Sequence, residues 1–548
     1  MRFKHLFAML LFLTVSSSVT GVAAEWSTLV QPIGTRNDPF LLDPAVLNQG
    51  YDPGKGPWET ATQVTSIKTT TQQFFVRFYN PTAPLNPSGQ EGGWVMRASE
   101  VRGLTPEQVR DKFALPNVPT MMTLGLTNTG ESLYTGLAGP IAGWGDGGGQ
   151  QSQRLDGPYT TFFNGQAVPA SVLAYPALAS SSNGRATATY LMAHVPEPYS
   201  DMESVYDSLD ILYNPAAASQ FDAALSNIGP ERFDNLFRVG YDATTLHNRA
   251  VEGRLDGGAG YAGGFWTVGT GSYGRHTEKG FDSGVAGVVG GYDRPWGGKG
   301  LYGLSIAWLR GRLGWNSGGR VDADFYRVAA YAALDDRPGF AQVMASAGAV
   351  CSHSSRGIVI GTWYQPSPHG PAVSPLSTVS RSASSSPGGW DADLTARGGT
   401  HVQSGDLTLV PTVEAGCLYQ SIGAFSESGA GGLDLRVADI SATTFHAAAS
   451  LRLERPVRYG LRSRLSPYLE AGWRYRRRLD GKAISASLNG WPDTFTVNVD
   501  DGSSSLAALS LGTSLTVGAG PVLFFEAFDE GDLQYGTWGL RAGVAWGW

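Results

Sequence analysis

Apolar and small or polar residues alternate strictly at the end of the chain, over residues 537–548. Every even position there is apolar, whereas the odd positions carry threonine, alanine, glycine and Arg541. A period of two with unlike faces predicts a β-strand between two different environments. A membrane-barrel strand needs about 9–11 residues that are apolar toward lipid and polar toward the lumen, so this segment predicts a transmembrane strand.

Further segments with this period precede it and together predict the fold. Parity is clear where Tyr302, Leu304 and Ile306 alternate with Gly303 and Ser305. The expected strands cover residues 263–276, 281–294, 300–313, 320–335, 339–351, 390–402, 407–420, 436–455, 464–479, 503–517, 521–531 and 536–548. A single-chain bacterial barrel has an even number of antiparallel strands. The predicted fold class is therefore an all-β membrane barrel of about 12 antiparallel strands.

The connections between these segments are sorted by length. Most even-numbered connections are short turns, such as 295–299 and 336–338, whereas three odd-numbered ones are long, at 352–389, 421–435 and 480–502. Outer-membrane barrels have short periplasmic turns and longer external loops, and a soluble sandwich has no reason to sort its loops in this way. We therefore expect both ends of the barrel in the periplasm.

Residues 215–256, directly before the first expected strand, carry a helical pattern. An alanine-rich stretch ends at Gly229, and Pro230 can begin a new helix with Phe233, Phe237 and Tyr241 on one face. About 25 helical residues reach roughly 37 Å, which exceeds an apolar band of about 25 Å. Because this helix is half polar, we predict that it fills the barrel lumen; an amphipathic helix packed on a soluble domain is the alternative.

Strand parity also places charged residues on the inner face of the barrel. Their burial requires opposite charges or contact with the helix, so we expect a structural role for them rather than a catalytic one. The set comprises Glu414, Glu470, Arg474, Glu526 and Arg541.

The N-terminus has the features of a signal peptide. Arg2 and Lys4 precede an apolar stretch, and small residues end at Ala24, so residues 1–24 are expected to be removed. Residues 25–214 mix β-rich stretches with short helices and predict a small α+β N-terminal domain that is large enough for its own core.

Two local features of residues 25–214 are specific enough to predict. Thr105 and Gln108 bracket a helix start with Pro106 at its first position, which is a capping box. The acidic residues from Glu197 to Asp210 lack the spacing of a calcium loop, and we expect a solvated helix face there.

Composition agrees with an exported barrel and limits the chemistry. Only 16% of the 548 residues are charged, and 73 glycines and 15 tryptophans suit an aromatic-girdled barrel. The net charge of −7 indicates no nucleic-acid partner. Cys351 and Cys417 fall on the fifth and seventh strands, about 10 Å apart, and should stay free thiols. Phosphate-binding and metal-binding spacings are missing, so no cofactor, metal or catalytic residue is expected.

Taken in chain order, several motifs resemble the autotransporter family of type V secretion proteins. They are the linker around Pro230, residues 265–274 at the barrel opening, 290–297 as a first periplasmic turn, and 320–331 as a fourth strand. The resemblance implies a passenger domain at residues 25–214, a lumenal helical linker at 215–256 and a translocator barrel at 257–548.

The resemblance also implies partners and a location. Periplasmic chaperones and the outer-membrane barrel assembly machinery would insert a monomeric barrel into outer-membrane lipid, with Trp548 closing the assembly signal. The passenger would be displayed at the cell surface. Some relatives cut the passenger at an Asn-Asn pair, which this chain lacks, so we expect the passenger to stay attached or to be cut externally.

Two other functions stay open from the sequence. An outer-membrane barrel enzyme such as a phospholipase needs a Ser/His pair on the outer face, and His276, His401 and His446 are the available strand histidines. Alternatively, the passenger could be a toxin-like or effector enzyme, which the sequence neither supports nor excludes.

Overall fold

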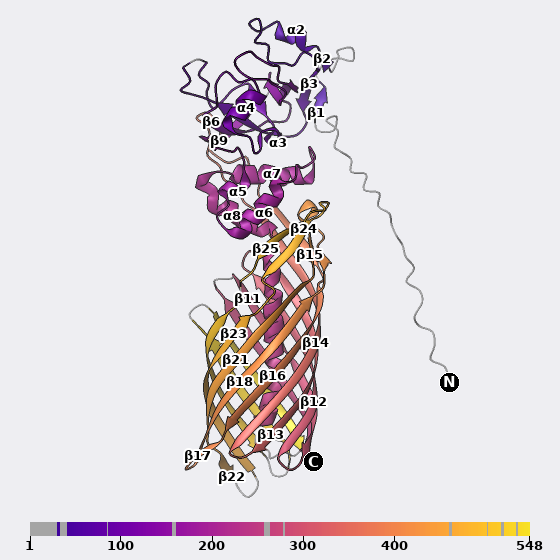
Figure 1. The fold of residues 1–548 in the computed structure, drawn as a ribbon, viewed down its shortest axis with the longest axis vertical. Coiled ribbons are helices and arrows are strands. Elements are labelled where there is room, and N and C mark those ends of the chain that lie inside the picture. Colours follow the sequence, from indigo (N-terminus) through magenta and orange to yellow (C-terminus); the bar gives the residue numbers. More distant parts are fainter. Residues whose placement is uncertain are drawn as a thin grey trace, which may run out of the picture. The chain divides into compact units, whose positions relative to one another are not determined.

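The computed structural model describes most of the chain, and it divides into two compact units (Figure 1). The N-terminal unit comprises the described residues up to Val172, together with Pro196–Asp207 and Gln365–Val373. The barrel unit comprises Leu173–Val195, Ser208–Tyr364 and the described residues from Ser374 onward. The described residues are 30–32, 41–84, 86–155, 160–256, 263–277, 280–459, 463–500, 502–516, 520–532 and 535–547. The expected signal peptide at 1–24 and the expected assembly-signal residue Trp548 lie outside them.

Twelve strands among the described residues form a closed antiparallel ring, which confirms the predicted barrel (Figure 1). Each strand pairs with the next, and the ring closes where β10 pairs with β28, from Gly264↔Gly547 to His276↔Tyr535. The ring consists of β10 (Gly264–His276), β11 (Phe281–Trp296), β12 (Gly300–Trp315), β13 (Gly319–Asp336), β14 (Gly339–Ile360), β16 (Gly388–Thr400), β18 (Leu407–Ile422), β21 (Ile440–Glu454), β23 (Ser463–Arg478), β26 (Ser504–Thr516), β27 (Val522–Gly531) and β28 (Tyr535–Gly547).

The two faces of the ring differ as the alternation predicts. On β12, Leu304 and Ile306 point outward and are 67% and 68% exposed, as expected for side chains that face lipid in a membrane barrel. On β28, Trp538 is exposed on the outside, whereas Arg541 is buried on the inside. No helix among the described residues has both the length and the apolar character needed to cross a bilayer.

The long connections predicted as loops contain strands of their own. β14 continues to Ile360 and pairs there with β15 (Val379–Ser385). The other two long connections form a separate four-stranded sheet of β19 (Phe425–Ser426), β20 (Leu435–Val437), β24 (Ala483–Leu488) and β25 (Phe495–Asn498), with a 3-10 turn η3 (Gly431–Leu433). Two short strands, β17 (Val402–Ser404) and β22 (Val457–Tyr459), lie at short turns.

Helices of the barrel unit precede the ring in sequence. They are α5 (Tyr175–Leu178), α6 (Ser182–Met192), the second part of α7 (Asp201–Leu212), η1 (Pro215–Ala217), α8 (Ala218–Ile228), η2 (Glu231–Asp234) and α9 (Asn235–Asp256). Helix α6 packs on β25: Asn183 exchanges two hydrogen bonds with the main chain of Asn498, and the His194 ring stacks on Trp491 at 4.2 Å. The helices are thereby fixed to the long connections of the barrel.

The N-terminal unit is an α+β structure, as predicted. Its sheet runs in the order β1-β3-β7-β8-β5-β4-β6-β9, with β2 also paired to β3, and its core includes Ile67, Phe75, Val95, Leu133 and Phe162. The strands are β1 (Val30–Pro32), β2 (Leu41–Leu42), β3 (Val64–Thr69), β4 (Phe74–Tyr79), β5 (Trp94–Met96), β6 (Met121–Leu126), β7 (Ser132–Leu137), β8 (Gln150–Arg154) and β9 (Thr161–Ala167). The helices are α2 (Pro44–Asn48), α3 (Ala98–Val101) and α4 (Pro106–Lys112).

Of the two local predictions for this region, one is confirmed and one is wrong. The capping box of Thr105 and Gln108 begins α4. The acidic face of α7, however, is not simply solvated: Asp210 is buried and accepts a hydrogen bond from the Tyr175 hydroxyl at 2.7 Å. Glu203 forms a largely buried ion pair with Arg97. These partners lie far away in sequence, so helical spacing could not show them.

Candidate functional site

Helix α9 runs inside the ring, where Figure 1 shows it in magenta behind the strands. It contacts β10, β11, β12, β13 and β18. Its polar side chains are buried on several sides, including His247, Arg249 and Arg254. A helix that is polar around most of its surface would be unstable in an apolar core. The polar inner face of a barrel can supply hydrogen-bond and ion-pair partners for its side chains.

The ends of α9 face opposite ends of the barrel. Before its first turn, Asp234 pairs with Arg478, the residue at which β23 leads into the long connection 479–503. At its last residue, Asp256 pairs with Arg397 at 2.8 Å and with Arg452 at 2.8 Å, on strands that end there in short turns. The 22 residues of α9 extend for roughly 33 Å, which is longer than an apolar band of about 25 Å. The helix is therefore long enough to cross a membrane layer.

The predicted linker residues lie at the long-connection end of this helix. Pro230 precedes the 3-10 turn η2, so α9 begins at Asn235 rather than at Pro230 as predicted. Phe233 is fully buried and meets the Phe425 ring edge-on at 4.8 Å. The Arg478 guanidinium lies 5.3 Å from the Phe237 ring, and that of Arg476 lies 5.2 Å from the Tyr241 ring. Aromatic residues of the linker thus form cation–π contacts with arginines of the barrel strands.

The five predicted lumenal charges line one small cavity beside α9. Arg541 donates to Glu526 at 2.6 Å, and Arg474 pairs with Glu530 at 3.1 Å. Glu470 pairs with Arg452 at 2.9 Å, and Glu414 lies 3.9 Å from His446. Arg249 of the helix pairs with Glu530 as well. Each charge therefore has an oppositely charged or titratable neighbour, although their structural role stays a prediction.

Sequence reasoning missed a second cluster, which joins α9 to β11. Arg254 donates through Nε and Nη2 to the two carboxylate oxygens of Asp293, at 3.0 and 2.9 Å. The Tyr331 hydroxyl donates to the same carboxylate at 3.1 Å, and Trp266 Nε1 donates to that hydroxyl at 2.8 Å. A fork of this kind is geometrically specific. A buried acid inside a strand was the available signal, but nothing in the sequence identified its helical partner.

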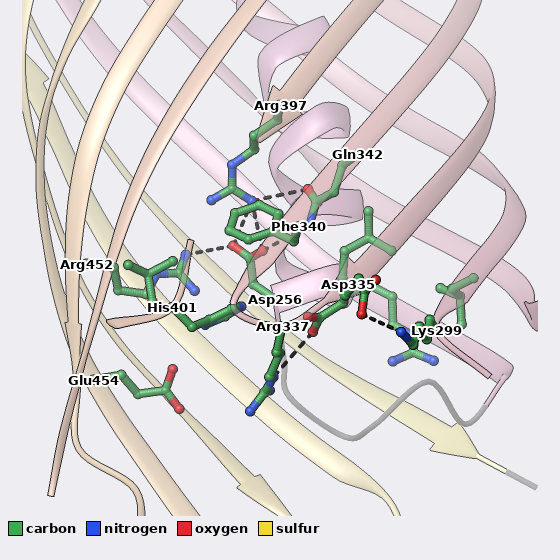
Figure 2. A pocket seen from close by; sticks show the side chains of 15 residues that line it. Asp256, Lys299, Asp335, Arg337, Phe340, Gln342, Arg397, His401, Arg452 and Glu454 are labelled. Carbon is green, nitrogen blue, oxygen red and sulfur yellow. Dashed lines mark hydrogen bonds and ion pairs between the residues drawn. The ribbon is translucent and has the colours of Figure 1, made fainter. Parts of the chain in front are cut away.

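A larger cavity of about 480 Å³ surrounds the C-terminal end of α9 (Figure 2). Figure 2 shows Arg397, Gln342 and Arg452 converging on the carboxylate of Asp256. The walls also carry the pair of Arg337 and Asp335 and that of Lys299 and Asp336. These groups neutralise one another, and those around Asp256 hold the end of the helix. Among the described residues, no three His, Cys, Asp or Glu side chains are grouped so as to hold a metal ion.

The three strand histidines do not serve a site on the outer face. His276 is buried between the rings of Phe281 and Tyr535. His446 bonds to Asp393 at 3.1 Å in the lumen, and His401 lines the cavity of Figure 2. An outer-face phospholipase site would need such a base beside lipid, so these positions do not support it.

The two cysteines lie on the outside of the barrel. Cys351 is on β14 and Cys417 is on β18, with β16 between them, and both are free and exposed.

Comparisons with known proteins agree with this geometry. The family model Autotransporter beta-domain matches residues 265–527. Among solved structures, the translocator domain of the autotransporter NalP from Neisseria meningitidis is similar, with 18% identity and a TM-score of 0.43, over 58% of this chain and 99% of that one.

Two further structures show lower likeness. The β-domain of the Bordetella autotransporter BrkA is similar at 17% identity and a TM-score of 0.38, over 52% of this chain and 100% of that one. The transport unit of the autotransporter AIDA-I from Escherichia coli gives 13% identity and a TM-score of 0.33, over 52% and 90%. A search of curated proteins found no match. Because these TM-scores are low, the family model carries the assignment: residues 265–527 form an autotransporter β-domain, which is an outer-membrane domain.

Proposed function

We propose that the barrel anchors the chain in the outer membrane and exports the residues before α9 to the cell surface. The observation that supports this most strongly is the path of α9. It enters the ring at the end with long connections, at Asp234, and ends among short turns, at Asp256. Because long loops of such barrels face outward, the chain before Asn235 emerges outside the cell.

In this proposal, ion pairs hold α9 in the lumen after export. Arg254 is fixed to β11 through Asp293, and Asp256 is fixed to β16 and β21 through Arg397 and Arg452. Pulling the helix out would separate these buried pairs and leave uncompensated charges in the lumen, so the helix should stay in place as a plug.

The passenger would comprise residues 25–214, and residues 215–256 would form the lumenal linker between it and the barrel. Periplasmic chaperones and the barrel assembly machinery would deliver and insert the monomeric barrel into outer-membrane lipid, recognising the terminal strand that ends at Trp548. Without an Asn-Asn pair, the passenger would stay attached or be cut externally.

Surface proteolysis tests the proposal directly. An epitope inserted after Gly54, a glycine with open space around it, lies in an exposed turn of the N-terminal unit. External protease on intact cells should remove the epitope, whereas a periplasmic marker protein should survive. An epitope that stays protected until the outer membrane is permeabilised would overturn the export proposal, even with a correctly folded barrel.

A further inference from the structure

One connection of the barrel belongs structurally to the N-terminal unit. Between the end of β14 at Ile360 and the start of β15 at Val379, the segment Gln365–Val373 is part of that unit, and we call it the clasp. It lies against β9, the last strand in the order of the N-terminal sheet. An edge strand presents unpaired N–H and C=O groups that can accept an added strand.

The clasp adds a short antiparallel pairing to that edge. Phe163 stands opposite Pro366; next to this pair, the Asn164 N–H donates to the Gln365 carbonyl at 2.8 Å, and the Ser367 N–H donates to the Phe162 carbonyl at 3.3 Å. The two hydrogen bonds flank the pair, so Pro366 occupies a non-hydrogen-bonded position. Its missing N–H therefore leaves no acceptor of β9 unsatisfied.

Side chains strengthen the pairing at both of its ends. Asn164 has a φ of 52°, and its Oδ1 accepts a hydrogen bond from the Gln365 N–H at 2.7 Å. One residue of β9 thus satisfies both main-chain groups of Gln365. Ser367 is buried, and its hydroxyl donates to the Glu91 carboxylate at 2.9 Å.

The sequence of the clasp restricts its conformation before it binds. It contains Pro366, Pro368 and Pro371, and the Gly370 N–H donates to the Ser367 carbonyl at 3.0 Å in a tight turn. Prolines reduce the number of conformations open to the unbound segment. Less entropy is then lost when the clasp pairs with β9, which favours binding by so short a segment.

We propose that the clasp is a non-covalent latch, which keeps the N-terminal unit on the barrel after the chain joining them has been cut. The chain passes from one unit to the other at five places, after Val172, Val195, Asp207, Tyr364 and Val373. A cut near the first of these places therefore leaves the clasp covalently joined to the barrel and still paired with the N-terminal unit. Residues Pro196–Asp207 form a second attachment of this kind, because Glu203 pairs with Arg97 of the N-terminal unit. This inference rests on the proposed function, since the clasp can pair with the N-terminal unit on the cell surface only if that unit is exported.

The test cuts the chain at one place on intact cells. A recognition site for a specific protease is inserted after the exposed Ala170, in the full chain that carries the epitope after Gly54. After cutting, the epitope should remain on the cells. Replacing Gln365–Val373 by a Gly/Ser segment of equal length should release the cut fragment about tenfold faster, since it removes the prolines that restrict the unbound segment and the Ser367 bond to Glu91.

Smaller variants keep the test decisive if the replaced segment impairs folding. Asn164→Gly tolerates the left-handed backbone but loses the acceptor for Gln365, and Ser367→Ala loses the bond to Glu91. Each should speed release about two- to tenfold. Val373→Ser is the matched control, because Val373 is in the same segment and 80% exposed.

The possible failures can be told apart. Release at the wild-type rate from the replaced segment and from both single variants would overturn the latch, while leaving export intact. An epitope that external protease cannot reach in the uncut protein would overturn the proposed export itself.

Discussion

Removing the Asp293 carboxylate tests whether ion pairs hold α9 in the lumen. Asp293 accepts both arms of the Arg254 fork and the Tyr331 hydroxyl, and its side chain is fully buried, with that of Arg254 8% exposed. Asp293→Ala would leave the guanidinium buried without its counter-ion. Losing one partner of a buried pair destabilises a protein by about 3–5 kcal/mol, mostly through the uncompensated charge.

Two companion variants separate charge from hydrogen bonding. Asp293→Asn keeps an acceptor for the Tyr331 hydroxyl but loses the negative charge, so we expect a loss of about 2 kcal/mol. Combining Asp293→Asn with Arg254→Met removes both charges. Because a buried ion pair is often replaceable by neutral groups at little loss, this double variant should recover most of the stability.

The assay is the temperature at which the purified full chain in detergent loses the fast electrophoretic mobility of a folded barrel. The expected order, from the most stable, is wild type, double variant, Asp293→Asn and Asp293→Ala. Conductance of the barrel in planar bilayers should rise in Asp293→Ala, as the helix end loosens. The reasoning would be refuted if Asp293→Ala unfolded at the wild-type temperature. It would also be refuted if the double variant lost as much stability as the sum of the losses in Asp293→Asn and in Arg254→Met alone.

Three further predictions use the same preparations. Gly303→Ala should destabilise the barrel by about 1–3 kcal/mol, because its Cβ would lie 2.5 Å from the Tyr331 ring, whereas Gly314→Ala on the same strand has open space and serves as control. Thr105→Ala should weaken the N-terminal unit by about 1 kcal/mol through loss of the cap on α4, measured as faster proteolysis of that unit in the full chain. A lipid-soluble maleimide should label both Cys351 and Cys417 in the folded barrel, and labelling of neither would contradict their outward placement.

The barrel strands could be predicted because lipid and lumen impose opposite demands on alternate residues. On β12 and β28 that contrast is strong, and the predicted strands match the observed ones to within a few residues. Beyond the lipid the contrast in the sequence fades, although burial still alternates. At the serine-rich end of β14 and in β15 the buried face carries polar residues such as Ser354 and Arg356, so the sequence there predicts a loop. The period of a strand is visible in the sequence only where its two faces carry different kinds of side chain.

Partners that lie far apart in sequence could not be predicted in the same way. Parity alone showed that Glu526 and Arg541 face inward, since each strand carries that information locally. The link between Arg254 and Asp293 depends instead on the height of α9 within the ring, which no local pattern encodes. The clasp was also missed, because its pairing with β9 is made largely by main-chain groups that any sequence supplies.

These long-range pairs make the helix and the ring interdependent. Arg249, Arg254 and Asp256 lie within two turns of α9, yet they pair with β27, with β11, and with β16 and β21. Each pair fixes both the height and the rotation of the helix, because a shift by one residue turns a side chain by about 100°. A helix taken from another barrel would bring its charges to different strands and leave buried groups unpaired on both sides. The helix and the inner face of the ring must therefore change together if the plug is to hold.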